Sequence, residues 1–206
     1  HEFFTGVPEI QNRPKVKKIW TKIEASIFPK LKHIITVNNS MRDGTLIIVG
    51  FVYIQLIFGA LMRHTASGMA IPDFPTMGGL WFPTFSDSMI NNINVILFDM
   101  DWDVVSRNQV IIHFLHRLGA VIVTGFIGHF FFKNRKIINT SNVLKKSMWL
   151  ILFIVIFQFT LGVLTVLTER APYIASFHVV NGAALLGASI LFVLRVQPLK
   201  YSKWFK

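Results

Sequence analysis

Apolar positions gather in four long runs along the chain, at residues 45–62, 110–132, 148–167 and 172–194. Each run meets or approaches the roughly 20 apolar residues that a helix needs to cross the hydrocarbon layer of a membrane. Lipid cannot satisfy the polar groups of an open backbone, so a span of this kind is expected to be helical. The pattern therefore predicts an all-α integral membrane protein with a bundle of four transmembrane helices.

The polar segments between the runs predict two further features. Residues 1–44 form a basic linker, in which 17–35 carry apolar residues on one helical side and lysines on the other. This favours a short helix on the inner membrane surface, with a solvated linker as the alternative. The outer loop, 63–108, combines prolines, glycines and aromatic residues, which indicates an ordered cap. Ser106 is the expected N-cap of the second span.

A short repeat links the two halves of the region 45–206. The stretch QLIFGAL at 55–61 matches QFTLGVL at 158–164, each Gln-x-x-x-Gly-x-Leu in an outward-running span. Each is followed by an outer connection and an inward-running span with a histidine near its start, His116 or His178. Short matches also arise by chance. We nevertheless expect the four helices to form two similar pairs, with an approximate internal two-fold repeat.

The charge pattern gives the bundle an orientation. Only 15% of the residues are charged, compared with about a quarter in soluble domains, yet the net charge is +11. Eight Lys/Arg lie in 1–44, five in 133–146 and four in 195–206. This positive-inside pattern predicts a lipid bilayer as partner, with both termini on the cytoplasmic or matrix side of a bacterial plasma membrane or mitochondrial inner membrane. It argues against a nucleic-acid partner, which needs a clustered basic patch.

The ends and the cysteine content limit the chemistry further. The chain has no cysteine, which excludes disulfides, thioether-attached haem and cysteine metal sites. It begins with His1 rather than Met, so we expect a piece of a longer protein.

Two histidines are predicted to meet inside the membrane. His116 and His178 each lie about 9–11 Å below the outer end of an inward-running helix, from a rise of about 1.5 Å per residue. Ionisable groups at such depth are costly and are functional by default. Matched histidines on two helices are the usual axial ligands of a haem iron. The alternative is hydrogen bonding between helices. A non-haem metal is disfavoured because no carboxylate lies near this depth.

Four neighbouring residues are candidates for binding the haem edge. Arg117 follows His116, and Arg63 with His64 lies where the first span leaves the membrane. All could hold a propionate, although Arg63 and His64 could equally be an ordinary interfacial pair. His113 could bind a propionate, move protons or face the membrane interface.

Two other polar residues receive weaker assignments. His129 lies about 20 Å deeper than His116, with no histidine opposite, so a second haem is not expected. Gln158 is interpreted as a polar contact between helices.

Three stretches carry a resemblance to a known family: GALMRHTASGMAIPDFP (59–75), IHFLHRLGAVIV (112–123) and LGVLTVLTERAPYIASFHVVNGAALL (161–186). They resemble the haem A synthase family, especially the C-terminal half of these eight-helix proteins. The resemblance implies an oxidoreductase that converts haem O to haem A, by oxidation of a methyl to a formyl group, for terminal oxidase assembly. It also implies two four-helix halves, and makes His116 and His178 ligands of a b-type haem (haem B).

Two departures from the family pattern change that expectation. The N-terminal half of the family has a carboxylate three residues before its His-Arg histidine, whereas this chain has His113. Many members carry two cysteines in the outer loop, where this chain has Ile71 and Met77. The resemblance therefore implies no catalytic residue here. The partner would be the missing N-terminal half, the chain alone would be inactive, and an oligomer stays open.

Three hypotheses follow from the sequence. The leading one is the b-type haem-binding C-terminal half of a haem A synthase. The second is a four-helix b-type cytochrome that anchors a partner dehydrogenase and carries its electrons. The third is a haem-free helical bundle whose histidines serve packing.

Overall fold

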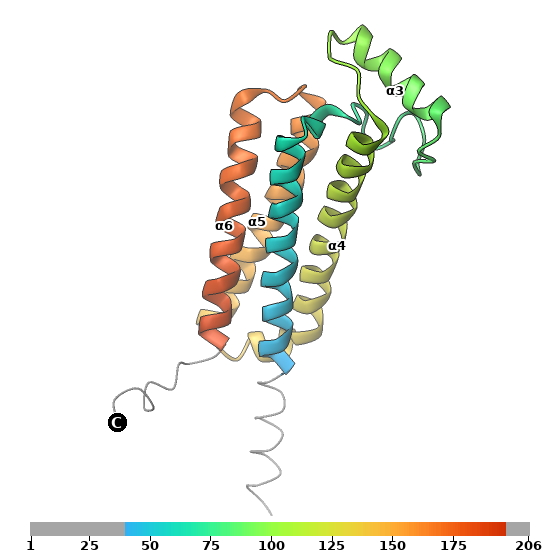
Figure 1. Cartoon of the computed structure of the whole chain (residues 1–206). Helices are drawn as coiled ribbons and strands as arrows, with labels where there is room; N and C mark the ends of the chain where they lie inside the picture. Colours follow the sequence, from blue (N-terminus) through green and yellow to red (C-terminus); the bar gives the residue numbers. More distant parts are fainter. Residues whose placement is uncertain (1–39, 197–206) are drawn as a thin grey trace, which may run out of the picture. The chain divides into compact units, whose positions relative to one another are not determined.

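The computed structural model describes residues 40–196, and the regular elements in this range are helical. Four helices are long and apolar enough to cross a membrane: the first span Ser40–His64, α4 (Arg107–Ile138), α5 (Asn142–Leu167) and α6 (Pro172–Val196). They run side by side as a bundle (Figure 1). The predicted all-α four-helix membrane fold is confirmed. The chain divides into the units His1–Asp43 and Gly44–Lys206, and the contacts below lie within the second.

Helix α4 extends six residues beyond the predicted end of its apolar run, to Ile138. The added turn and a half contains Arg135 and Lys136 in its last turn. Long basic side chains are good helix formers and interact favourably with the negative end of the helix dipole. The helix therefore continues after the hydrophobic run has ended. The predicted surface helix at 17–35 lies outside the described residues.

Close helix packing near the inner end of the bundle depends on a glycine. A Cβ atom on Gly44 would lie 2.5 Å from Cε2 of Phe130, so only glycine lets the first span approach α4 this closely. Phe130 also forms an edge-on contact with Phe192 of α6, with ring centroids 6.5 Å apart. These contacts join the first span, α4 and α6 around the buried ring of Phe130.

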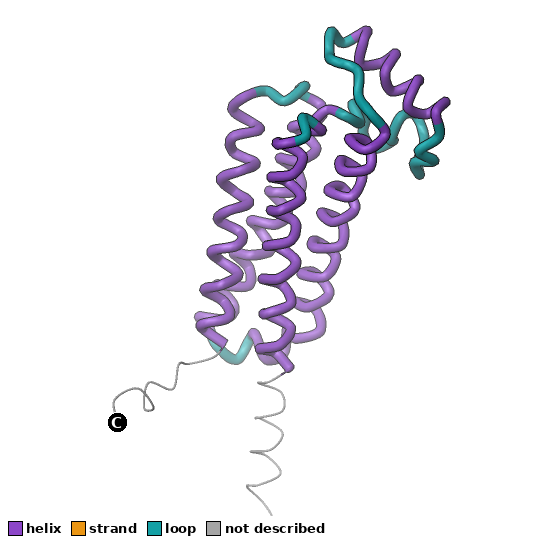
Figure 2. Tube along the Cα trace, in the orientation of Figure 1, coloured by secondary structure: helices purple, strands orange, loops and turns teal. Residues whose placement is uncertain are grey.

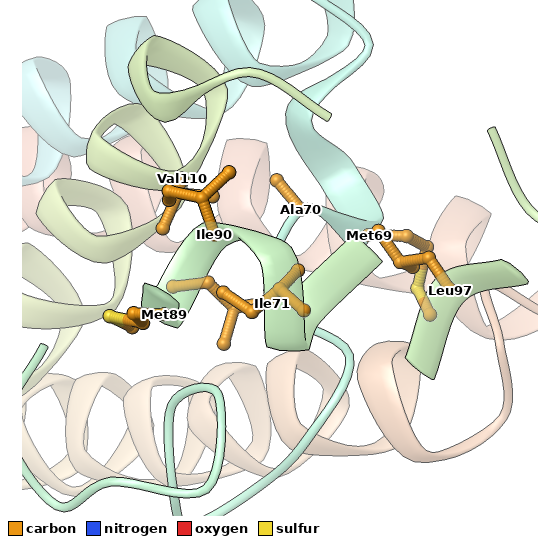
Figure 3. Packing of buried hydrophobic residues seen from close by; sticks show 8 residues of the cluster. Met69, Ala70, Ile71, Met89, Ile90, Leu97 and Val110 are labelled. Atoms are coloured by element: carbon orange, nitrogen blue, oxygen red, sulfur yellow. The ribbon is translucent and has the colours of Figure 1, made fainter. Parts of the chain in front are cut away.

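The outer loop folds into an ordered cap, as expected. It contains the short 3-10 helix η1 (Ser67–Met69) and the helix α3 (Asp87–Asp99), and Figure 2 shows loops gathered with α3 beyond the start of α4. A hydrophobic cluster holds it together (Figure 3), comprising Met69, Ala70, Ile71, Met89, Ile90, Ile93, Leu97 and Val110. Because Val110 belongs to α4, the cluster also fixes the cap to the bundle.

Polar contacts strengthen the attachment of the cap to α4. Ser106 is the N-cap of α4, as predicted, and its backbone N–H donates to Oε1 of Gln109 at 2.8 Å. The same glutamine donates through Nε2 to the carbonyl of Thr65 at 2.9 Å. From the connection between α5 and α6, Arg170 lies over the ring of Trp102, 5.7 Å from its centroid. The loop 63–108 and the connection between α5 and α6 therefore both contribute to the cap.

Truncating the core of the cap should destabilise it selectively. Leu97 is fully buried and Phe98 is 78% exposed on the same helix. We expect Leu97→Ala to destabilise the cap by about 2–5 kcal/mol, the usual range for a buried leucine, and Phe98→Ala to have less than about 0.5 kcal/mol of effect. Hydrogen exchange of the α3 amides measures both. Equal protection in the two variants would contradict the assigned core.

Candidate functional site

The imidazole rings of His116 and His178 face each other inside the bundle. His116 comes from α4 and His178 from α6, and their ring centroids lie 6.5 Å apart at an interplanar angle of 73°. Two positions that are 62 residues apart in the chain thus meet at one level. The two rings lie close together, as expected for histidines at one level of the bundle, while their role as ligands stays a prediction.

A glutamine from the first span contacts the His116 ring. Nε2 of Gln55 lies 3.2 Å from Nδ1 of His116 and donates to the backbone carbonyl of the same histidine at 2.8 Å. One turn further along the first span, a Cβ on Gly59 would lie 3.4 Å from Cε1 of the ring. The imidazole therefore rests against a glycine while the amide contacts its nitrogen.

The same arrangement recurs around His178. Nε2 of Gln158 on α5 lies 3.4 Å from Nε2 of His178, and a Cβ on Gly162 would lie 3.2 Å from Cε1 of that ring. Asn181 on α6 donates to Oε1 of Gln158 at 2.9 Å and to the carbonyl of Ile154 at 3.1 Å. The approximate two-fold repeat predicted from Gln-x-x-x-Gly-x-Leu is confirmed, because in both copies the glutamine contacts a ring nitrogen and the glycine lies against Cε1. The copies differ in the nitrogen, which is Nδ1 in His116 and Nε2 in His178.

Two more glycines make room for the glutamines. A Cβ on Gly119 would collide with Oε1 of Gln55 and lie 3.2 Å from its Cδ. A Cβ on Gly182 would lie 3.2 Å from Nε2 of Gln158. Both glycines follow a site histidine by three or four residues, so each inward helix presents a histidine and then a gap for the amide.

Reasoning from the sequence missed the glutamine contacts. Gln158 was expected to join helices, which it does through Asn181, but its contact with His178 was not anticipated. Gln55 entered only as part of the repeat, and Asn181 was not singled out. The repeat itself could have indicated these contacts, since both of its copies place Gln and Gly at matching positions before a histidine.

The histidine pair has the dimensions of a two-ligand metal site. Two imidazoles whose nitrogens each lie about 2 Å from one metal have ring centroids roughly 6–6.5 Å apart. In addition, Nδ1 of His178 is buried and has no hydrogen-bond partner. Among residues 40–196, no group of three or more His, Cys, Asp or Glu side chains could hold a metal. A two-histidine donor set fits haem, because the porphyrin brings four nitrogens of its own.

Arg117 and His113 contact the backbone of the cap. The guanidinium donates to the carbonyls of Ile71 at 2.7 Å, Asp73 at 2.9 Å and Thr76 at 3.4 Å. The backbone N–H of Ile71 donates to Nδ1 of His113 at 3.1 Å, while Nε of Arg117 lies 3.0 Å from Nε2 of the same ring. His113 is buried, so it does not face the membrane interface. Both residues therefore help to clamp the cap onto α4.

The remaining candidates lie at the edges of this arrangement. Arg63 and His64 have exposed side chains at the outer end of the first span, about one turn beyond Gly59. Their assignment to a propionate stays a prediction. His129 is exposed near the inner end of α4, far along the helix from the histidine pair.

Asp73 holds the turn that Arg117 clamps. Its two carboxylate oxygens accept from the backbone N–H groups of Gly78 at 2.7 Å and Gly79 at 2.9 Å. Burial of this carboxyl raises its pKa, but hydrogen bonds from the Thr76 side chain and from Gly79 and Gly78 together outweigh burial. The pKa of Asp73 is therefore lowered from its ordinary value of 3.8. The carboxylate serves as a structural acceptor in the cap.

Comparison with known proteins places the chain in a family. The family described as cytochrome oxidase assembly protein matches residues 18–190, most of the chain. The chain belongs to this family. The curated relatives that it matches include haem A synthases. No solved structure matches the chain.

Three relatives illustrate the extent of similarity. A haem A synthase of Wolbachia pipientis from Culex pipiens is 28% identical over 81% of this chain and 45% of its own length. The haem A synthase of Saccharomyces cerevisiae is 25% identical over 84% of this chain and 36% of its own length. That of Flavobacterium psychrophilum is 26% identical over 83% and 47%. The chain thus spans less than half the length of these relatives.

Acidification should loosen the Asp73 turn. A carboxylate with a lowered pKa contributes stability that is fully present above its unfolded pKa and is lost as pH falls through its folded pKa. We expect protection of the Gly78 and Gly79 amides to be constant down to about pH 4 and to fall below it. Hydrogen exchange, corrected for intrinsic rates, measures this. Asp73→Asn should lack the acid transition, and an unchanged transition in that variant would assign it to another group.

Replacing Arg117 should release the cap. A lysine has its three N–H donors on one nitrogen, so it cannot reach at once the carbonyls that the two terminal nitrogens of the planar guanidinium contact. Because hydrogen bonds to charged groups contribute about 1.5–3 kcal/mol, Arg117→Lys should speed amide exchange in residues 71–76 about tenfold or more. The control is Arg107→Lys, which alters an exposed pair with Asp87. Equal exchange in the two variants would exclude the clamp.

Proposed function

We propose that this chain is the b-type haem-binding C-terminal half of a haem A synthase, with His116 and His178 as axial ligands of one haem B. The observation that carries the proposal is the pair of facing imidazoles, 6.5 Å apart between ring centroids, on α4 and α6. Family membership supports it over the alternative of a cytochrome anchor for a dehydrogenase. The coverage of the relatives agrees with a half-length unit.

The residues of this chain would bind and orient the haem. His116 and His178 would hold the iron from two faces, and the apolar side chains of the surrounding helices would exclude water from it. When bound, such a haem supplies one-electron redox chemistry. Arg63, His64, Arg117 and His113 remain the proposed contacts for its propionates. Arg117 already donates to cap carbonyls, so its effect on the haem edge would include holding the cap in place.

The chemistry of oxidation would depend on the other half of the protein. His113 occupies the position of the family's carboxylate, and here it is buried between Ile71 and Arg117. The cap carboxylate Asp73 is engaged by two backbone N–H groups. No group of this chain is thus proposed as the catalytic acid. We infer that the complete protein converts haem O to haem A for oxidase assembly, and that this chain alone does not.

The proposal includes an orientation in the membrane. The basic segments before the first span, between α4 and α5 and after α6 would lie on the cytoplasmic or matrix side. The cap and the histidine pair would then lie towards the opposite side. The acidic residues Asp87, Asp99, Asp101 and Asp103 of the cap region agree with this arrangement, because they belong to the side that lacks excess Lys and Arg.

Absorption spectroscopy of the purified full chain in detergent tests the ligand assignment. Titration with haem B should give a six-coordinate low-spin spectrum, with a sharp Soret band and split α and β bands on reduction. His116→Ala and His178→Ala should each abolish this spectrum, because each removes one axial ligand. His129→Ala is the matched control on α4 and should retain it. Either absence of haem binding by the wild-type chain or wild-type spectra in both site variants would refute the proposal.

A further inference from the structure

We propose that Gln55 and Gln158 are positioning residues that set the orientation of the two site imidazoles. This inference rests on the proposed function, because it assigns the glutamines a role toward a haem held by His116 and His178. It goes beyond helix packing, since Gln55 contacts Nδ1 of His116 at 3.2 Å and Gln158 contacts Nε2 of His178 at 3.4 Å. The ring nitrogens left for a metal would then be Nε2 of His116 and Nδ1 of His178, the latter buried without a hydrogen-bond partner.

Each amide is itself held by a second partner. Gln55 also donates to the backbone carbonyl of His116, so the side chain is tied to the same helical turn that carries the ring. Gln158 accepts from Asn181, which donates as well to a backbone carbonyl of α5. A group that is fixed by two contacts restrains the rotation of the imidazole beside it. The ring orientation is therefore set by a glutamine from a neighbouring helix, the first span for His116 and α5 for His178.

The glycines around each amide show that its place is built into the helices. Gly119 and Gly182 leave the space that Gln55 and Gln158 occupy, and any Cβ at these positions would contact the amides. Gly59 and Gly162 lie one turn after the glutamines, and a Cβ on either would approach Cε1 of the ring, next to the nitrogen that the amide contacts. Each imidazole thus has an amide and a glycine along the same part of its edge, once in each helix pair.

An uncharged amide suits this role inside a membrane. It carries both a donor and an acceptor, so it can serve a ring nitrogen in either tautomer of histidine. A carboxylate would add the cost of a buried charge at this depth. When one ring nitrogen binds a metal, the hydrogen bond at the other nitrogen fixes the ring and tunes the ligand, and loss of such a partner weakens binding by about 10- to 100-fold.

A purely structural role for the glutamines makes different predictions. Polar side chains between transmembrane helices contribute only modestly to the stability of a bundle. Removing such a contact would lower the stability of the bundle and leave the electronic properties of a bound haem unchanged. A positioning role instead changes the ligand field, because the plane and the basicity of each axial imidazole depend on its partner.

The experiment uses the purified full chain with haem B as the probe. Gln55→Met and Gln158→Met keep the length of the side chain and remove the amide. We expect each to weaken haem binding about 10- to 100-fold and to shift the g values of the ferric low-spin haem in electron paramagnetic resonance.

Matched controls come from the neighbouring positions. Ile54→Ala and Phe157→Ala change exposed side chains directly beside the two glutamines, and should leave affinity and g values at wild-type levels. If the methionine variants do not fold, Gln55→Asn and Gln158→Asn replace them. These retain an amide between the helices but withdraw it from the ring by one methylene, so the same losses are expected.

The outcomes separate this inference from the proposed function. Wild-type affinity and g values in the methionine or asparagine variants would overturn the positioning role while leaving the ligand assignment intact. If the wild-type chain takes up no haem, the proposed function fails, and nitrogen NMR of the histidine rings decides the inference. Shifts confined to His116 in the Gln55 variant and to His178 in the Gln158 variant would then support it, whereas unmoved signals would overturn it.

Discussion

Polar groups inside a bundle of apolar helices have to find their partners within the bundle, and the two site histidines do so through glutamines. Membrane lipid offers no hydrogen bonds, so an imidazole at this depth is retained only where neighbouring helices serve it. This requirement explains why glycines recur beside the site on all four helices: Gly59, Gly119, Gly162 and Gly182. Helix spacing, ring position and amide position thus depend on one another.

A segment of about one and a half turns of α4 contacts both the interior of the bundle and the cap. His116 faces the bundle, whereas His113 and Arg117 face the cap and bind its backbone. A helix makes this division possible, because Arg117 lies about 40° from His113 around the helix axis, whereas His116 is rotated by about 100° from Arg117. The cap therefore has a fixed relation to the site through α4, and a change in either would reach the other through a single helical segment.

The two-fold repeat corresponds to two similar sets of side chains, one in each helix pair. Each helix pair supplies a glutamine, a glycine, a histidine and a second glycine, and the two sets meet where the imidazoles face each other. This unit has its own pair of histidines and its own cap. That organisation agrees with a chain that covers less than half of the length of its relatives. Under the proposed function, this half would hold a haem between its helix pairs, while the carboxylate chemistry would belong to residues outside the chain.

The sequence by itself determined the number and course of the helices, the ordered cap and the pairing of His116 with His178. Hydrophobic run length and helix rise are local quantities, so four spans and two matched depths could be read directly from residue positions. It also contained the repeat that marks Gln55 and Gln158. Only the tertiary structure decided what these glutamines and their glycines contact, because side chains from different helices meet according to helix rotation and packing. The same holds for Arg117, whose position beside His116 indicated a propionate, whereas the fold of the cap brings three backbone carbonyls to its guanidinium.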